Sequence, residues 1–434
     1  MSSNSSTTAA CPLKGSATSP GVARRMPRTL VSIFACAAGL SVANVYYAQP
    51  LLDALTNDFG ISQGAAGGVI TATQVGCALA LLFLVPLGDQ WERRRLMLVQ
   101  LALLTVSLLA VSASTSAVAL LAGMTFVGML GTAMTQGLIA YASSAAGEHE
   151  RGRVVGATQG GVVVGLLLAR VMSGAIADIA GWRGVYVASA LAMLGLGGVL
   201  WRALPRQAVP GISAASAASG ASGASGARQR YPVLLMSMFG LLRTERTLQI
   251  RGAIALLMFM AFSIFWSALV LPLSAAPFHF SHTTVGAFGL VGAAGALAAA
   301  RAGHWADRGW AQRTTGVSLV VLTLSWLPLA GLHASLVWLV LGVLLLDLAG
   351  QAIHVTNQSL IFAARTDAPS RLVGAYMLFY AMGSGLGAVA ATATYAAYGW
   401  IGVCVLGAGV SVTALMFWAA TLHAMPRGSA SLGT

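Results

Sequence analysis

Four polar residues recur at helical spacing within one long apolar run. Asp347 lies about 11 residues into this run, and Gln351, His354 and Gln358 follow it at positions +4, +7 and +11. This spacing places all four side chains on one face of an α-helix. A carboxylate and an imidazole can exchange protons with a water-filled path. The face therefore predicts a site of proton transfer, although a polar seam packed against neighbouring helices would give the same pattern.

Arg170 is a second charge within an apolar run. A cation in this position could bind an anion or form an ion pair. Alternatively, its long side chain could extend along the helix until the guanidinium reaches the surface. Arg301 is a similar case, but it lies only six residues before Asp307 in a charged turn, so we expect it to reach the surface.

The composition shows what kind of protein must hold these residues. The chain has 434 residues, of which 57% are hydrophobic and 8% are charged. A soluble protein has about a quarter of its residues charged, so this chain lacks the charge needed to cover a soluble surface. It is predicted to be a multi-pass membrane protein. A charge at the centre of a bilayer costs at least ~2.5–3.5 kcal/mol, so each buried charge needs a reason.

The apolar runs are long enough to cross a bilayer, which takes about 20 residues in a helix. We predict an all-α membrane protein with twelve transmembrane helices. The expected spans are 29–48, 65–87, 95–114, 117–142, 154–177, 184–203, 252–273, 285–303, 314–332, 336–363, 373–396 and 400–422. At helical rise, Asp347 is roughly 16 Å into the tenth span, near the middle of the membrane.

The basic residues predict the orientation of the spans. The formal net charge is +13, and all but three of the 24 Lys and Arg fall on segments that alternate to one side. The exceptions are Arg170, Arg183 and Arg301. This bias predicts a cell (inner) membrane protein with both termini in the cytoplasm. The positive charge therefore reports topology, and no nucleic-acid partner is expected.

The two halves of the chain repeat one another. The charged turn at Asp89 returns at Asp307, 218 residues later. Two further motifs return at the same step: 153–157 at 371–375, and 181–187 at 399–405. One shared offset through three motifs indicates a tandem duplication, which is typical of transporters built from parallel repeats. We therefore expect two pseudo-symmetric six-helix bundles, at 29–203 and 252–423.

The repeated turn resembles the first cytoplasmic-loop motif of the major facilitator superfamily. Val85 and Glu92 replace two glycines of that motif. The matching residues of the first copy are Leu87, Gly88, Asp89, Arg93 and Arg94, and those of the second are Gly303, Ala306, Asp307 and Arg308. The resemblance implies a transporter that alternates between two states. Asp89, Arg93, Arg94, Asp307 and Arg308 are expected to form conformational latches on the inner side.

The same resemblance implies that the first, fourth, seventh and tenth helices line a central cavity. Gln136 of the fourth span corresponds to His354 by the 218-residue step, so the two are expected to face each other across the path. Asn44, Tyr47 and Trp266 are further candidates. The full set expected in the substrate cavity is Asn44, Tyr47, Gln136, Arg170, Trp266, Gln351 and Gln358.

The sequence also departs from two further motifs of the family. Arg170 stands where antiporters of the family carry a proline in the fifth helix, and Met124 stands where an arginine is expected in the fourth. The first span also lacks the acid that many drug/proton antiporters carry, since none lies between Leu30 and Pro50. Proton coupling is therefore assigned to Asp347 and His354.

The remaining segments are polar. Residues 1–28 and 424–434 are predicted cytoplasmic tails, the first of them disordered, and 204–251 is a linker with an Ala/Ser/Gly tract. The linker ends in apolar residues at helical spacing, with Arg243, Arg246 and Arg251 beyond them. This part is either a helix on the inner membrane surface or an extension of the seventh span.

The predicted function is secondary active transport of a small molecule by alternating access, as proton-coupled efflux. The alternatives are import of a small polar or anionic metabolite and a transport-dead receptor on the same scaffold. The sequence contains no nucleotide-binding G-x-x-x-x-G-K-[ST] loop and no dense His/Cys cluster, so we expect neither cofactor nor metal, and no enzyme activity. Expected partners are the substrate, protons and the lipid bilayer, with the protein as a monomer.

Overall fold

The computed structural model describes residues 26–89, 91–146, 150–204, 231–298, 306–364 and 369–422. These residues form helices joined by short turns. Within them, nine helical segments are long and apolar enough to cross a membrane. Most of both predicted tails, most of the linker and Arg301 lie outside the described residues.

The first half of the chain forms a bundle of helices. Its long helices are α1 (Arg28–Tyr46), α3 (Gly67–Leu79), α4 (Arg93–Ser112), α5 (Ala117–Ala145) and α6 (Arg151–Ala203). Its short elements are η1 (Gln49–Leu51), α2 (Leu52–Phe59), η2 (Gln63–Ala65), the π-helical η3 (Ala80–Leu84) that continues α3, and η4 (Pro86–Asp89).

The second half repeats this arrangement after one extra helix, α8 (Tyr231–Thr244). Its long helices are α9 (Arg246–Ala268), α11 (His282–Ala298), α13 (Ala311–Leu324), α15 (Leu336–Ala364) and α16 (Pro369–Thr421). Its short elements are α10 (Val270–Ser274), η5 (Ala306–Trp310), α14 (Trp326–Ala330) and η6 (Gly331–His333).

The longest helix of each half is bent at a glycine. α6 and α16 have 53 residues each, and each contains one residue outside helical geometry: Gly181 with φ 70° and Gly399 with φ 64°. Positive φ is a conformation that glycine adopts without steric cost. Gly399 follows Gly181 by the 218-residue step of the sequence repeat, so the duplicated motif forms the same turn in both halves.

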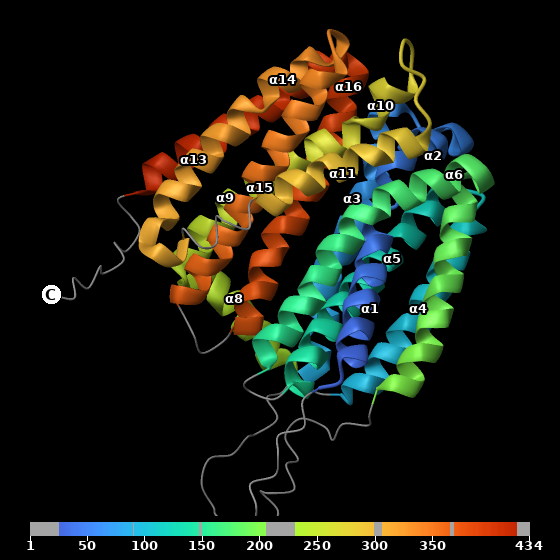
Figure 1. Cartoon of the computed structure of the whole chain (residues 1–434), viewed down its shortest axis with the longest axis vertical. Helices are drawn as coiled ribbons and strands as arrows, with labels where there is room; N and C mark the ends of the chain where they lie inside the picture. Colours follow the sequence, from blue (N-terminus) through green and yellow to red (C-terminus); the bar gives the residue numbers. More distant parts are fainter. Residues whose placement is uncertain are drawn as a thin grey trace, which may run out of the picture.

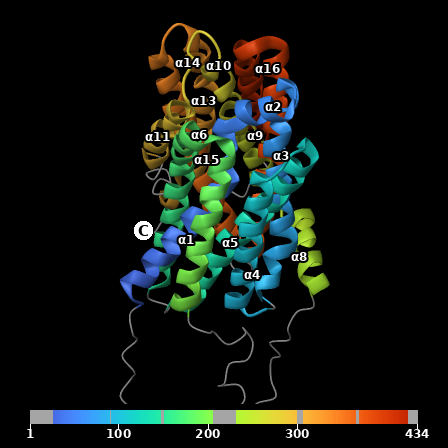
Figure 2. The ribbon, with the colours of Figure 1, turned by 90° about the vertical axis from the view of Figure 1, so that its right-hand side faces the viewer.

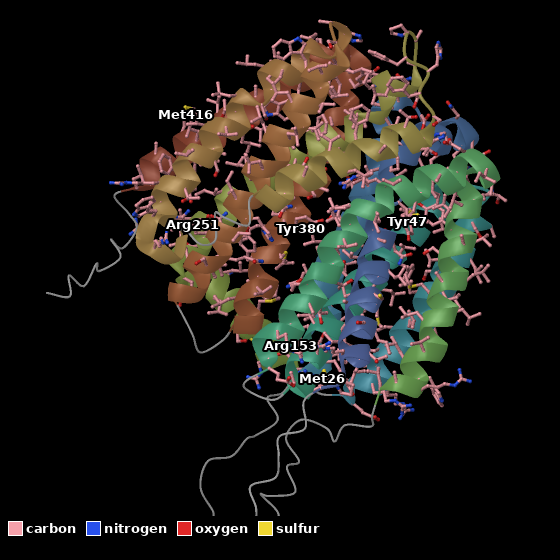
Figure 3. The ribbon with its side chains drawn as sticks, viewed as in Figure 1. Met26, Tyr47, Arg153, Arg251, Tyr380 and Met416 are labelled. Atoms are coloured by element: carbon pink, nitrogen blue, oxygen red, sulfur yellow. The ribbon has the colours of Figure 1, made fainter. Side chains whose placement is uncertain are left out.

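Figure 1 shows the N-terminal bundle, coloured blue to green, beside the C-terminal bundle, coloured yellow to red. The bundles contact through α3 against α16 and through α6 against α11. Met26 and Arg153 lie together at one end of the N-terminal bundle (Figure 3), which we call the tail end. The opposite end carries the bends at Gly181 and Gly399, and we call it the bend end.

Apolar side chains cover the outside of the bundles as well as their interior. Val106, Leu191 and Val405 are 62%, 63% and 67% exposed, and many other large apolar residues are also exposed. Soluble monomers rarely expose continuous apolar surface, whereas helices in lipid require it. The structure thus confirms an all-α membrane protein.

The segment before α9 differs from one of the two expectations. Glu245 leaves helical geometry (φ −87°, ψ 96°) between α8 and α9, so α8 is a separate helix. It lies beside α16 and η4 at the flank of the molecule (Figure 2). Arg251 is fully buried inside α9, where it donates hydrogen bonds to Thr315 Oγ1 (3.1 Å) and Asn357 Oδ1 (3.3 Å). Its assignment to the surface linker is therefore wrong, because Thr315 of α13 and Asn357 of α15 supply its polar partners inside the bundle.

Candidate functional site

Arg170 lies inside the protein, where α6 faces the C-terminal bundle. Its side chain is buried, with 2% of the residue exposed. Its Nε donates to Gln49 Oε1 at 2.9 Å, and its guanidinium lies 4.1 Å from the ring centre of Trp266 and 5.4 Å from that of Tyr46. Cation–π contacts of this kind stabilise a desolvated cation. The arginine therefore does not reach the surface. It packs against Trp266 of the other bundle, and both residues belong to the set predicted for the substrate cavity.

Asp347 is the acidic group of the same region. It is 4% exposed, and its Oδ2 is buried without a hydrogen-bond partner. Arg170 is the charge that acts electrostatically on this carboxylate, although the two groups do not form a direct ion pair. Opposite charges from the two halves of the chain thus lie in one interior region. A buried carboxylate without a fixed partner is costly unless it takes up a proton or finds an ion.

His354 belongs to a separate aromatic cluster. Its Nδ1 lies 3.0 Å from Tyr376 Oη, and its ring packs edge-on against Phe259 at 5.3 Å between ring centres. Phe259 also packs against Tyr380, whose hydroxyl hydrogen-bonds the hydroxyl of Tyr46 in the other bundle. Figure 3 shows Tyr380 between the bundles. The hydrogen-bond partner of His354 is thus Tyr376 of α16.

A cavity of about 100 Å³ near the tail end is lined mainly by η3, η4, α4 and α5 of the N-terminal bundle. Gln136 and Gln100 contribute polar groups to its lining, while Met238 and Gly374 line it from the second half of the chain. His354 does not line this cavity. The expected positions of Gln136 and His354 on opposite sides of a central path stay a prediction.

Two predicted cavity residues point elsewhere. Asn44 Oδ1 accepts a hydrogen bond from Ser189 Oγ at 2.6 Å, and Tyr47 also contacts Ser189. Ser189 lies in α6 beyond the bend, so both side chains pack within the N-terminal bundle. The neighbouring residue Tyr46 contacts Tyr380 of the C-terminal bundle instead, and the assignment of Asn44 and Tyr47 to a substrate cavity stays a prediction. Gln351 and Gln358 are half-buried on α15.

Polar side chains close the bend end between the two halves. Asp178 of α6 accepts hydrogen bonds from the backbone N–H groups of His282 (3.0 Å) and Thr283 (2.9 Å), which are the first residues of α11. The His282 ring lies 3.1 Å from Asp178 through Nδ1 and 3.1 Å from Asp53 of α2 through Nε2. We call Asp53, Asp178 and His282 the clasp. It joins the halves outside the predicted spans.

The clasp should weaken as pH rises. Its hydrogen bond to Asp53 is the main cause that raises the pKa of His282 above 6.5, with burial opposing it. Asp53 and Asp178 are the charged groups that act on the ring. A raised pKa in the closed form means that the imidazolium favours closure at pH below 6.5, and that this contribution is lost as pH rises through the closed-form pKa. We therefore expect the open fraction of the bend end to increase severalfold between pH 5.5 and 8.5.

Spin labels at Asn57→Cys and Ala276→Cys, both exposed, would report this opening as a longer distance in double electron–electron resonance. The background should lack the natural cysteines. In His282→Gln the distance distribution should no longer change with pH. A wild-type distribution that is the same at pH 5.5 and 8.5 would contradict the role given to His282.

The latch arginines bind backbone carbonyl groups at the tail end. Arg93 donates to Gly88 O (3.2 Å) and Ala140 O (2.7 Å), and Arg94 donates to Trp201 O (2.8 Å). Arg308 is exposed. The side chains of Asp89 and Asp307 lie outside the described part of the chain, so the latch itself stays a prediction.

Several residues of the site were not expected from the sequence, among them Gln49, Tyr46, Tyr376, Tyr380, Asp53, Asp178 and His282. Tyr46 and Gln49 lie within two residues of the candidate Tyr47, and Tyr380 follows Tyr376 by one helical turn. His282 is the first residue of α11, directly after Ser281, whose hydroxyl accepts from Thr284 N. The sequence here indicates a helix start and gives no sign of a contact between the halves.

Residues 34–361 match the family model described as Major Facilitator Superfamily. The chain is 38% identical to the protein named Uncharacterized transporter YgaY of Escherichia coli O157:H7 over 401 residues, which cover 91% of this chain and 96% of that one. It is 29% identical to the Purine ribonucleoside efflux pump NepI of Salmonella typhimurium over 196 residues, which cover 44% of this chain and 47% of that protein.

The fold is similar to a solved structure of a bacterial homologue of the human lysosomal transporter Spinster, described as inward-facing and unoccupied. The TM-score is 0.71 at 15% sequence identity, and the match covers 90% of this chain and 96% of the other. The two-bundle arrangement is thus shared along nearly the whole chain.

Proposed function

This chain belongs to the Major Facilitator Superfamily, and we propose that it is a proton-coupled secondary transporter that exports a small molecule by alternating access. The observation that carries the proposal is Asp347, a buried carboxylate of α15 with an unpartnered oxygen. It lies against α11, the helix that packs on α6 of the other bundle. Ionisable groups inside membranes are costly and typically serve transport. We assign the coupling proton to Asp347.

In this proposal the tail end faces the cytoplasm and the bend end faces outward. The arginine distribution supports this orientation, and so does the closed clasp opposite a cavity at the tail end. The conformation is then inward-facing, as is the solved structure that it resembles. Twelve spans follow if α6 and α16 each cross twice at Gly181 and Gly399, and if the 17-residue α11 crosses once.

The substrate path in this proposal runs between the bundles. Gln136 borders it in the tail-end cavity. Arg170 and Trp266 lie farther from the tail end, beyond the hydrogen-bonded pair Tyr46 and Tyr380. Gln351 and Gln358 face it from α15, and His354 acts on it through Tyr376. Efflux is favoured as the direction because one relative, over about half its length, is named a purine ribonucleoside efflux pump.

The second candidate is import of a small polar or anionic metabolite. Arg170 favours it, since its Nη2 is buried without a hydrogen-bond partner and could bind an anion. A receptor on the same scaffold is the third candidate. The three differ in what the purified protein does in a closed vesicle.

The test is transport by the purified full chain in proteoliposomes. Radiolabelled purine ribonucleosides, carboxylic acids and cationic drugs would be offered as a panel, first in counterflow and then with a pH gradient across the membrane. We expect counterflow of at least one compound, and its accumulation against its own gradient when a pH gradient is imposed. Binding without counterflow would indicate a receptor, and accumulation that does not respond to the pH gradient would contradict proton coupling.

A further inference from the structure

The side chain of Arg170 has an environment that is unusual for a buried cation. Its fixed contacts are all to uncharged groups: Gln49 Oε1 at 2.9 Å, Leu166 O at 3.5 Å and the rings of Trp266 and Tyr46. Its Nη2 has no hydrogen-bond partner. Neutral contacts lower the cost of burial but do not balance the charge. A compensating anion is therefore required nearby.

α11 places Arg170 near Asp347, a carboxylate of the other bundle that acts on it electrostatically. A Cβ added at Gly289 would lie 3.3 Å from Arg170 Cδ, and a Cβ added at Gly292 would lie 2.7 Å from Asp347 Oδ2. These glycines are three residues apart and share one face of the helix. The arginine stem and the carboxylate thus pack on adjacent turns of the same face of α11, one from each half of the chain.

The contact of Asp347 with α11 lies within one bundle, whereas the contact of Arg170 with α11 joins the two bundles. Asp347 and α11 belong to the same bundle, and a Cβ at Gly295 would lie 2.5 Å from Leu344 O, so α11 and α15 are tightly packed. Arg170 comes from the other bundle, where a Cβ at Gly286 would lie 2.2 Å from its backbone oxygen. That contact must break if α6 and α11 separate. Opening of the bend end would therefore move Arg170 away from Asp347 while the carboxylate stays in its bundle.

We propose that Arg170 is the electrostatic partner that decides when Asp347 is ionised. With the bend end closed, the guanidinium stabilises the carboxylate, which then gives its proton to water on the tail-end side. With the bend end open, the guanidinium withdraws, and the carboxylate takes a proton from water on the opposite side. Arg170 is thus a positioning residue for proton coupling. This inference rests on the proposed function, and it makes α6–α11 separation the step that loads the proton.

The test measures the protonation of Asp347 without any substrate. Infrared difference spectra of the purified full chain at a series of pH values would contain the carbonyl stretch of the protonated carboxyl group. The band that is missing in Asp347→Asn belongs to this residue. In Arg170→Gln we expect its midpoint to move to higher pH by about one unit or more, a tenfold change in proton affinity. Arg170→Lys, which keeps the charge, should stay near the wild-type midpoint.

An unchanged midpoint in Arg170→Gln would overturn the proposal. The proposal would also be overturned if the band were absent at every pH in both the wild type and Arg170→Gln. A band that appears only in Arg170→Gln would support the proposal. Because the measurement needs no transport, a shifted band in a protein that fails to couple protons would refute the proposed function alone.

A second measurement covers the case in which Arg170→Gln yields too little protein for infrared spectra. Melting temperatures of Arg170→Gln, Asp347→Asn and the double variant form a double-mutant cycle. If the two charges compensate each other, the double variant should melt higher than the sum of the single losses predicts. Strictly additive losses would contradict the pairing, whatever the yield of the single variants.

Discussion

Asp347→Asn is expected to abolish uphill, pH-gradient-driven accumulation while energy-independent exchange continues. Asparagine has nearly the shape of aspartate but cannot carry a proton, so the step that links transport to the gradient is lost. The substrate path itself remains. The measurement is the accumulation ratio and the exchange rate of one transported compound in the same proteoliposomes, with the ratio expected to fall to one.

Asp58→Asn is the matched control for this substitution. Asp58 is also a carboxylate, but it is bound by Trp182 Nε1 (3.0 Å) and Arg183 within the N-terminal bundle at the bend end. Its replacement should leave accumulation above half of the wild-type ratio. If Asp347→Asn still concentrates the compound against its gradient, the coupling proton is carried elsewhere.

Gly76→Ala should cause a large loss of stability through a single added methyl group. A Cβ at Gly76 would lie 1.9 Å from Thr125 O and 2.8 Å from Met129 N, so the backbones of α3 and α5 must separate. Overpacking of this kind typically costs 1–3 kcal/mol or more, and close helix approach in lipid depends on small residues. We expect a melting temperature lowered by several degrees or more in detergent, with loss of the monodisperse protein.

Gly68→Ala, in the same helix, provides the comparison. A Cβ there would have no atom within 4 Å, so the same chemical change should leave the melting temperature within about a degree of wild type. Equal melting temperatures for the two variants would mean that α3 and α5 are not packed through Gly76.

The two substitutions lie near different contacts between the halves. α3 packs on α5 within its bundle and on α16 across the halves, where Thr71 Oγ1 donates to Gly385 O at 2.7 Å. α6 packs on α11 across the halves near Arg170. These are the two contacts that must rearrange if the bundles rock against each other. The clasp lies beside the second of them, which is why its pH dependence bears on the same transition.

The sequence by itself determined the class and the internal symmetry of the protein. Long apolar runs with few charges can form only helices in a bilayer, because every backbone polar group must be bonded within its own segment. The 218-residue step predicted equivalent turns at Gly181 and Gly399, and both have positive φ. The cost of a charge in an apolar run also identified Asp347 and Arg170 as residues that need a partner.

Only the tertiary structure decided which residues are partners. Helices that are apolar on all sides carry little information about their rotation, so the sequence could not decide whether Tyr46 or Tyr47 faces the other bundle. Periodicity grouped Asp347 with His354 because it relates residues of one helix. The observed neighbours, Arg170 for Asp347 and Tyr376 for His354, come from other helices. Such contacts depend on how glycine faces allow helices to approach, and that is a property of the packed bundles.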